Sequence, residues 1–213
     1  MVEQTKPEPL AVTCTSTDCE NNLHCFLQSK EMAPEQRGTC RECGANLIDW
    51  SCVHRRDPND AEHTFAQLRF EMIRHHFFHK PFDQKAINHA RRKGRILLRE
   101  AIEARLSNYL APAQISFGRM ITPYNGNTIY YGQHATATCC RKCLEYWHGI
   151  PMGVELTSEQ LDYCVKLVEL YLDLRLPDLN EHPVVVPPIR KTAASEQQKA
   201  PTTIVQASTL LSR

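Results

Sequence analysis

Residues 134–149 read HATATCCRKCLEYWHG, a stretch that places three cysteines between two histidines. If residues 138–149 form a helix, Cys143 lies one turn from both Cys139 and Cys140, so the three thiols share one side of that helix. The N-terminus of a helix and two adjacent basic residues also stabilise thiolates. The stretch therefore predicts a chemical site on the first turns of a helix.

Three interpretations fit this cluster. His134, Cys139, Cys140 and Cys143 are candidate ligands of a zinc ion, with His148 as a further neighbour, because zinc prefers thiolates and imidazoles. Alternatively, Cys140 and Cys143 form a redox pair, or one cysteine is a nucleophile beside a histidine. In the third interpretation the thiols are small hydrophobic side chains buried around a core tryptophan.

The sequence leaves a catalytic role for this cluster open. In a metalloenzyme, an open position on the ion would activate water for hydrolysis or nucleobase modification, with His148 as the candidate proton carrier. In a thiol enzyme, Cys140 is the candidate nucleophile. In a zinc-stapled binding or adaptor module, protein ligands would fill every position. The cytidine-deaminase signature of His-x-Glu with Pro-Cys-x-x-Cys is not matched, because Ala-Thr follows His134.

A second cysteine cluster lies in residues 13–53, which hold six of the ten cysteines. This segment is short and polar, so it needs a staple in place of a large hydrophobic core. Cys40-Arg-Glu-Cys43-Gly is the zinc-knuckle arrangement, in which two thiolates on a tight turn reach one tetrahedral ion and glycine admits the left-handed backbone. We therefore expect a zinc-ribbon-like module that is stabilised by a structural zinc.

A knuckle needs a second pair of ligands, and the upstream cysteines supply it. Cys19 and Cys25 are the preferred pair beside Cys40 and Cys43, but the spacing also fits Cys14 with Cys19, or the use of a histidine at position 24.

Hydrophobic spacing predicts four helices in the remainder of the chain. They are expected over residues 60–81, 82–93, 98–111 and 158–176, bounded by Pro81, Gly94, Pro112 and Pro177, and the last begins at a Thr157–Gln160 capping box. Residues 113–138 contain glycine, proline and the pair Asn125-Gly126 next to the short apolar run 129–131. This pattern predicts a loop-rich insertion with one hairpin. The expected fold is mainly α with minor β.

Composition divides the chain into four parts. Residues 1–12 and 180–213 are rich in Pro, Thr, Ser and Gln without a sustained period, so we expect flexible tails around the module at 13–53 and a helical domain at 54–179. The 213 residues carry 25 basic and 24 acidic groups, which excludes a global field toward nucleic acid or membrane. No apolar run reaches the roughly 20 residues of a membrane span. With no signal-peptide pattern and many cysteines, a cytoplasmic location and metal or thiol chemistry are expected.

A local basic stretch covers residues 84–99, QKAINHARRKGRILLR, which contains no acidic residue. Such a run is often only the solvated face of a helix. It is also a candidate surface for nucleic acid or a nucleotide, bound through phosphate contacts rather than through the bases. The candidate phosphate-binding residues are Lys85, Arg91, Arg92, Lys93, Arg95 and Arg99.

These motifs resemble the signature of a bacterial family catalogued as domain of unknown function 4186. The resemblance is carried by QHATATCCRKC at 133–143, by WHGIP at 147–151 and by ELT at 155–157. Further matching segments are RL at 105–106, LAPA at 110–113, TP at 122–123, Tyr171 and RLPDL at 175–179. Longer members share LHCF at 23–26, CRECG at 40–44, DW at 49–50, RHHF at 74–77 and ARRKGR at 90–95.

The resemblance implies that both cysteine clusters belong to one architecture spanning about residues 14–179, and it supplies no activity or substrate. One departure concerns the segment before Thr122-Pro123. The family pattern has Asp-Gly-x-Gln there, whereas this chain has FGRMI at 117–121, so an expected acidic residue near position 117 is absent.

Overall fold

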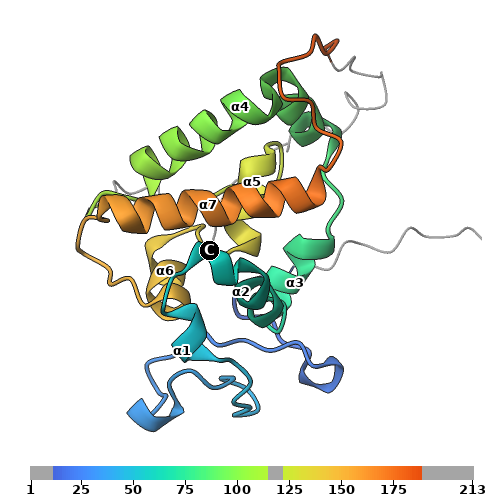
Figure 1. The fold of residues 1–213 in the computed structure, drawn as a ribbon. Coiled ribbons are helices and arrows are strands. Elements are labelled where there is room, and N and C mark those ends of the chain that lie inside the picture. The colour runs from blue at the N-terminus through green and yellow to red at the C-terminus, as the bar shows by residue number, and fades with distance from the viewer. Residues whose placement is uncertain (1–11, 115–121, 189–213) are drawn as a thin grey trace, which may run out of the picture.

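The computed structural model describes residues 12–114 and 122–188, which are mainly helical (Figure 1). The helices are α1 (Trp50–Val53), α2 (Ala61–Leu68), α3 (Met72–His79), α4 (Gln84–Tyr109), α5 (Thr128–Ala135), α6 (Arg141–His148) and α7 (Ser158–Arg175), with short 3-10 helices at Cys19–Asn21, Pro34–Gln36 and Pro58–Asp60. Within these ranges, β structure is limited to two isolated bridges. The predicted mainly α fold is confirmed, and none of the described helices is long and apolar enough to cross a membrane.

Helix α7 crosses the centre of the molecule and packs against α4 and α5 (Figure 1). The predicted capping box forms its start: the Thr157 hydroxyl accepts from the Gln160 amide N–H at 3.3 Å, and the Gln160 side chain accepts from the Thr157 amide N–H at 3.1 Å. Helix α5 also contacts α3 and α4, so it joins α3 to the pair formed by α4 and α7. This central position places the sequence around His134 in the interior.

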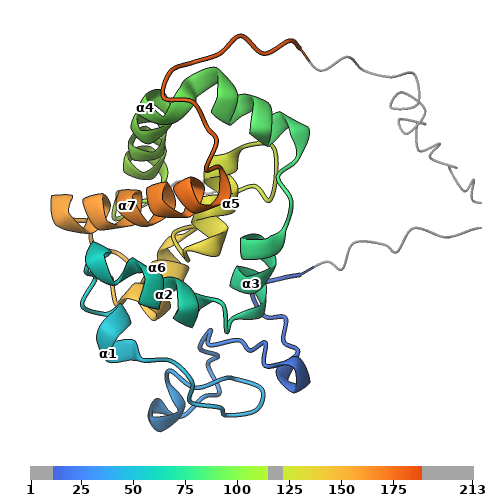
Figure 2. The same cartoon turned by 45° about the vertical axis from the view of Figure 1, so that its right-hand side comes forward.

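Helix α4 is interrupted at Gly94, where the backbone takes φ 65° and ψ 177°. The two helices predicted on either side of this glycine are therefore present as two arms, and Figure 2 shows the bend between them. A Cβ atom at Gly94 would lie 2.5 Å from the backbone oxygen of Glu181, so only glycine fits under the segment that follows α7.

The segment that follows α7 lies within the predicted C-terminal tail, but its first residues are bound to α4. The amide N–H of Arg95 donates to the Asn180 carbonyl at 2.9 Å, and the amide N–H of Val184 donates to the Arg91 carbonyl at 3.0 Å. Residues 180–184 are therefore held on α4 by backbone hydrogen bonds that the composition did not reveal. The first predicted tail up to residue 11, and the second from residue 189, lie outside the described residues.

The single helix predicted over residues 60–81 is two helices, α2 and α3. The break falls where the N-terminal module joins the domain: the His24 amide N–H donates to the Phe70 carbonyl at 2.7 Å, and the Met72 amide N–H donates to the His24 carbonyl at 2.9 Å. Glu71, which forms a parallel bridge with His24, has an extended backbone. A continuous helix would have no free backbone groups for this junction.

The hairpin expected within residues 113–138 is wrong. Its apolar run belongs to helix α5, which begins at Asn127, where the side-chain oxygen accepts from the Ile129 amide N–H at 2.9 Å. Asparagine is a strong N-cap, and Asn127, which directly follows the Asn-Gly pair that suggested a turn, caps a helix instead.

Residues 13–53 form little regular structure apart from α1 and two 3-10 helices. In both views they lie at the end of the molecule near α2 and α6 (Figures 1 and 2). Phe26 is fully buried and meets the rings of Trp147 and Trp50 edge-on, with centroid distances of 5.9 and 6.0 Å. These aromatic contacts anchor the N-terminal module to the helical domain.

Candidate metal sites

The first group of ligand-type side chains lies entirely in the N-terminal module. Cys19, His24, Cys40 and Cys43 each offer one atom, and the four atoms lie within 4.8 Å of one another. The Cys19 and Cys40 sulfurs are 3.8 Å apart, and the Cys43 sulfur lies 3.4 Å from Nδ1 of His24. Three cysteines and one histidine around a common centre are geometrically able to hold a metal ion.

The Cys40–Gly44 turn positions two of these thiols. The Gly44 amide N–H donates to the Cys40 carbonyl at 2.8 Å, and Gly44 has φ 75°, the left-handed conformation predicted for the residue after the knuckle. Burial raises the pKa of the Cys40 thiol, but donated backbone N–H groups, including that of Cys43, outweigh burial and bring the pKa to about 6. The thiolate that a metal needs is therefore favoured at neutral pH.

His24 faces the group with Nδ1, while its other ring nitrogen is held from outside. Its Nε2 lies 3.0 Å from the side-chain oxygen of Asn22, which only accepts, so Nε2 carries the proton and Nδ1 keeps its lone pair. A histidine that ligates a metal commonly has its second nitrogen held by an oxygen in this way.

The structure does not bring Cys25 to this group, although it was the preferred partner of Cys19. The Cys25 side chain is fully buried and its thiol donates to the Cys14 carbonyl at 3.2 Å. His24 takes the place expected for Cys25, the alternative that the spacing left open. Adjacent residues in an extended segment point to opposite sides, so only one of the two can face the knuckle.

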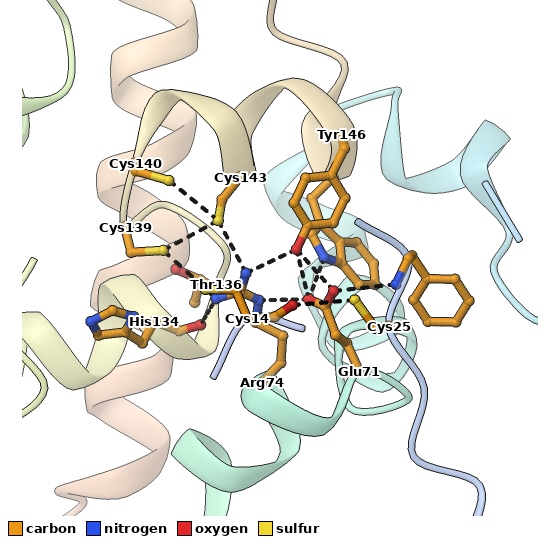
Figure 3. Close-up of polar contacts among 12 residues, drawn as sticks. Cys14, Cys25, Glu71, Arg74, His134, Thr136, Cys139, Cys140, Cys143 and Tyr146 are labelled. Carbon is orange, nitrogen blue, oxygen red and sulfur yellow. Dashed lines mark hydrogen bonds and ion pairs between the residues drawn. The ribbon is translucent and has the colours of Figure 1, made fainter. Parts of the chain in front are cut away.

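The second group contains Cys139, Cys140 and Cys143, whose sulfurs also lie within 4.8 Å of one another. The Cys143 sulfur lies 3.4 Å from each of the other two. Helix α6 begins after Cys140, its N-cap residue, which is later than the start expected near residue 138. The first turn of α6 nevertheless gathers the three thiols as predicted (Figure 3).

Arg74 brings a buried positive charge to this thiol group from α3 (Figure 3). Its guanidinium donates to the Cys143 sulfur at 3.2 Å and to the His134 carbonyl at 2.6 Å, and forms an ion pair of 2.9 Å with the buried Glu71. Hydrogen bonds from the Cys139 thiol and other thiols, together with the charge of Arg74, hold the pKa of Cys143 well below its usual range.

Arg74 and Glu71 were not among the predicted site residues. The available signal was a charged residue at a core position of an apolar helix, since Arg74 lies beside Ile73 and one turn from Phe77 and Phe78. Glu71 also accepts hydrogen bonds from Trp147 Nε1 at 2.7 Å and the Tyr146 hydroxyl at 2.9 Å.

His134 contributes its backbone to the second group, whereas its ring lies apart from the three-thiol set. The ring stacks against both Phe77 and Tyr124, at 4.6 Å from each centroid, and its Nε2 donates to the Thr122 carbonyl at 2.9 Å. Nδ1 is buried and has no hydrogen-bond partner among the described residues. Burial and the charge of Arg74 lower the pKa of His134 to about 4, so the ring is neutral at pH 7.

His148, the candidate proton carrier, is fully buried and is not part of the three-thiol group. Its Nε2 lies 2.9 Å from the Thr136 carbonyl and therefore donates, while Nδ1 accepts from the Tyr163 hydroxyl at 3.0 Å. Burial lowers the pKa of His148 to about 4. With both ring nitrogens engaged, His148 supports the fold and is not positioned as a proton carrier.

Cys140, the candidate nucleophile, is half-buried. A hydrogen bond from Cys139 lowers the pKa of Cys140. Burial and the interaction with Cys143 raise it by more, so the pKa of Cys140 lies above its ordinary value. A raised pKa disfavours the thiolate form that a nucleophile requires.

Besides Cys14 and Cys25, two further thiols lie outside these two groups. Cys52 forms a third set with Asp49 and His63, both exposed, but its sulfur accepts from Arg55 at 3.0 Å. Cys164 is fully buried in α7, and burial raises its pKa to about 12, as expected of a structural thiol.

The predicted basic stretch separates into two parts on α4. Arg95 pairs with Asp173 and donates to the carbonyls of residues 176, 177 and 179, and Arg99 lies 3.8 Å from Glu169. Both therefore hold α4 to α7 and its following segment. The other four have no ion pair in the part of the chain that the structure describes: Lys85, Arg91, Arg92 and Lys93.

The departure noted at residues 117–121 lies outside the described residues. Thr122, the first described residue after it, donates its hydroxyl to the Cys139 carbonyl at 2.8 Å.

Comparison with known proteins gives a family without an assigned role. The family model described as "Domain of unknown function (DUF4186)" matches residues 62–173, more than half of the chain. No solved structure matches.

Proposed function

The chain belongs to the DUF4186 family, and because its description assigns no role, we propose from the residues themselves that the protein is a zinc-stapled binding module. The single observation that carries this proposal is the convergence of Cys19, His24, Cys40 and Cys43 within 4.8 Å. Three thiolates and one imidazole form a complete tetrahedral set for structural zinc, with no position left for substrate.

The donor chemistry fits zinc better than a hard cation. The first group offers sulfur and nitrogen and the second offers sulfur alone, whereas calcium and magnesium require oxygen ligands. Zinc bound to the first group would hold together the loops of residues 13–53, which form few helical hydrogen bonds of their own. The module would in turn keep Phe26 seated on Trp147.

The decisive experiment measures zinc in purified protein and in Cys43→Ser, with Cys164→Ala as the matched control. We expect Cys43→Ser to lose the zinc of the first group and to expose residues 13–53 to protease, because the module cannot bury enough apolar surface alone. Cys164→Ala removes a buried thiol outside every group and should retain all zinc. Wild-type protein that folds without zinc, or Cys43→Ser with a full metal content, would refute the proposal.

We also propose that the module binds nucleic acid or another polyanion through the free half of the basic stretch. The support is that Arg91 and Arg92 are exposed and unpaired within the described residues, and Lys85 and Lys93 lie on the same arm of α4. Binding of this kind would depend on phosphate contacts and therefore on salt.

The test compares the triple variant of Arg91, Arg92 and Lys93 to Ala with a triple variant that removes the same charge elsewhere. Lys30, Arg37 and Lys142 serve as that control, since all three are exposed at the opposite end of the domain near α6 and the module. We expect only the α4 variant to weaken binding to duplex DNA or RNA, and to reduce the salt slope by up to about 0.9 for each lost phosphate contact. Equal binding by both variants would exclude this surface.

A metal-dependent hydrolase or base-modifying enzyme is the second candidate function. The observations in its favour are that the second group offers three thiols, one fewer than a closed site needs, and that the buried Nδ1 of His134 has no hydrogen-bond partner among the described residues. A zinc ion held by three thiolates would supply Lewis acidity to a bound water. His148 has no free nitrogen for this chemistry, so turnover that survives His148→Gln but not His134→Gln would favour the enzyme.

A further inference from the structure

We infer that Cys14 is the fourth ligand of a second zinc site, together with Cys139, Cys140 and Cys143. This inference deepens the proposed function, on which it rests, because it closes the second group with a thiolate from the N-terminal module. The site would then join the module to the helical domain rather than activate water.

The three α6 thiols already have the separation of a metal site. Zinc–sulfur bonds of about 2.3 Å in a tetrahedron place the sulfurs about 3.8 Å apart. The observed distances of 3.4 Å from Cys143 to both Cys139 and Cys140 are close to this value. A tetrahedral ion at this position needs one more donor.

Cys14 is the candidate for this position. It is not part of the three-thiol set, but its thiol interacts with those of Cys143 and Cys140, and Figure 3 draws Cys14 in the same cluster as Arg74. The Cys25 thiol, which donates to the Cys14 carbonyl at 3.2 Å, fixes the backbone that presents Cys14. The interaction connects residues far apart in the sequence, so neither motif indicates it alone.

The alternative fourth donors are less suitable. Both nitrogens of His148 are already engaged, and Nε2 of His134 donates to the Thr122 carbonyl. The remaining nitrogen of His134 belongs to a buried ring that stacks against Phe77 and Tyr124 and is held in place by the Nε2 hydrogen bond to Thr122.

Arg74 suits a site of four thiolates. Such a site with zinc carries a net charge of −2, which is costly to bury unless it is compensated. The fully buried guanidinium supplies a positive charge and donates to the sulfurs of Cys143 at 3.2 Å and Cys139 at 3.7 Å. Charge-assisted hydrogen bonds of this kind are stronger than neutral ones.

The first test counts zinc in the full chain. Wild type should hold two zinc ions, and Cys14→Ser should retain the first while its affinity for the second falls at least about tenfold, since even outer-shell changes cost 10–100-fold. Cys25→Ser is the matched control, because a serine there can still donate to the Cys14 carbonyl, and it should keep both ions. Two equally tight zinc ions in Cys14→Ser would overturn the inference.

A second test uses unaltered protein and does not depend on whether Cys14→Ser folds. Cys14 is partly exposed, so a thiol-alkylating reagent can reach its sulfur once metal is removed, and at alkaline pH the thiolate that reacts is populated further. We expect protection of Cys14 together with the three α6 cysteines in zinc-loaded protein, and reaction of all four after chelation. Alkylation of Cys14 at the same rate before and after chelation would overturn the inference.

The outcomes also separate this inference from the proposed function. Wild type with no zinc would reject both, whereas one zinc that is lost in Cys43→Ser would keep the first site and reject the second.

Discussion

Replacing Arg74 with methionine tests the buried polar contacts that join α3 to α5 and α6. Both Arg74 and Glu71 are fully buried, and Arg74 donates to Glu71, the His134 carbonyl, Cys143 and the Tyr146 hydroxyl. Arg74→Met would leave the Glu71 carboxylate without its counter-charge. Removing one partner of a buried pair costs about 3–5 kcal/mol.

The assay is urea or thermal unfolding followed by the fluorescence of the buried Trp147, in buffer saturated with zinc. A loss of about 3–5 kcal/mol corresponds to a fall in Tm of about 6–20 °C for a domain of this size. Arg92→Met is the control, since that exposed side chain should change stability by no more than about 0.5 kcal/mol.

A double-mutant cycle identifies the cause. Glu71→Gln removes the stranded charge, so the double variant should be more stable than the sum of the single losses by about 1–3 kcal/mol. Arg74→Lys should recover only part of the loss, because an ammonium group cannot reach all four acceptors at once. A loss below about 1 kcal/mol in Arg74→Met, or full additivity, would refute the assignment of Arg74 as the structural link.

Two further outcomes are expected, one on acid stability and one on the α4 bend. Because burial holds the pKa of His148 at about 4 against an ordinary value of 6.5, the unfolded chain binds the extra proton first as pH falls. The stability that neutral His148 confers is thus complete above about pH 6.5 and is lost toward pH 4, by at most about 3 kcal/mol at about 1.4 kcal/mol per pKa unit. The urea midpoints of wild type and His148→Gln should converge as pH falls over this interval. A difference between the midpoints that stays constant would show that His148 is not the source of the pH dependence. Gly94→Ala should lower the Tm more than Gly44→Ala. Both glycines have positive φ, but only at Gly94 would the new Cβ meet another backbone, at 2.5 Å from the Glu181 oxygen. Equal falls in Tm would show that residues 180–184 move away to make room for the Cβ.

The location of the chemistry could be predicted from local sequence. Cys40 and Cys43 are brought together by one tight turn and Cys140 and Cys143 by one helical turn, so chain geometry alone fixes their proximity. The capping box at Thr157 was predictable for the same reason, since its hydrogen bonds join residues three apart.

The failures of prediction arise where a distant segment determines the backbone. The break between α2 and α3 depends on hydrogen bonds with His24, and the order of residues 180–184 depends on a closely packed Gly94. Periodicity within either segment carries no information about the partner. The Asn127 cap was a local signal, but asparagine favours both turns and helix starts, and only packing of α5 against α7 selects the helix.

The sequence by itself determined the mainly helical fold and the two cysteine-rich sites, because their ligands are close neighbours along the chain. Only the tertiary structure decided which residues complete each site: it selected His24 over Cys25, brought Arg74 to the thiols and placed Cys14 in the same cluster as Cys143. The physical reason is that a short turn fixes the positions of nearby side chains, whereas donors that are tens of residues away meet only after the core has packed.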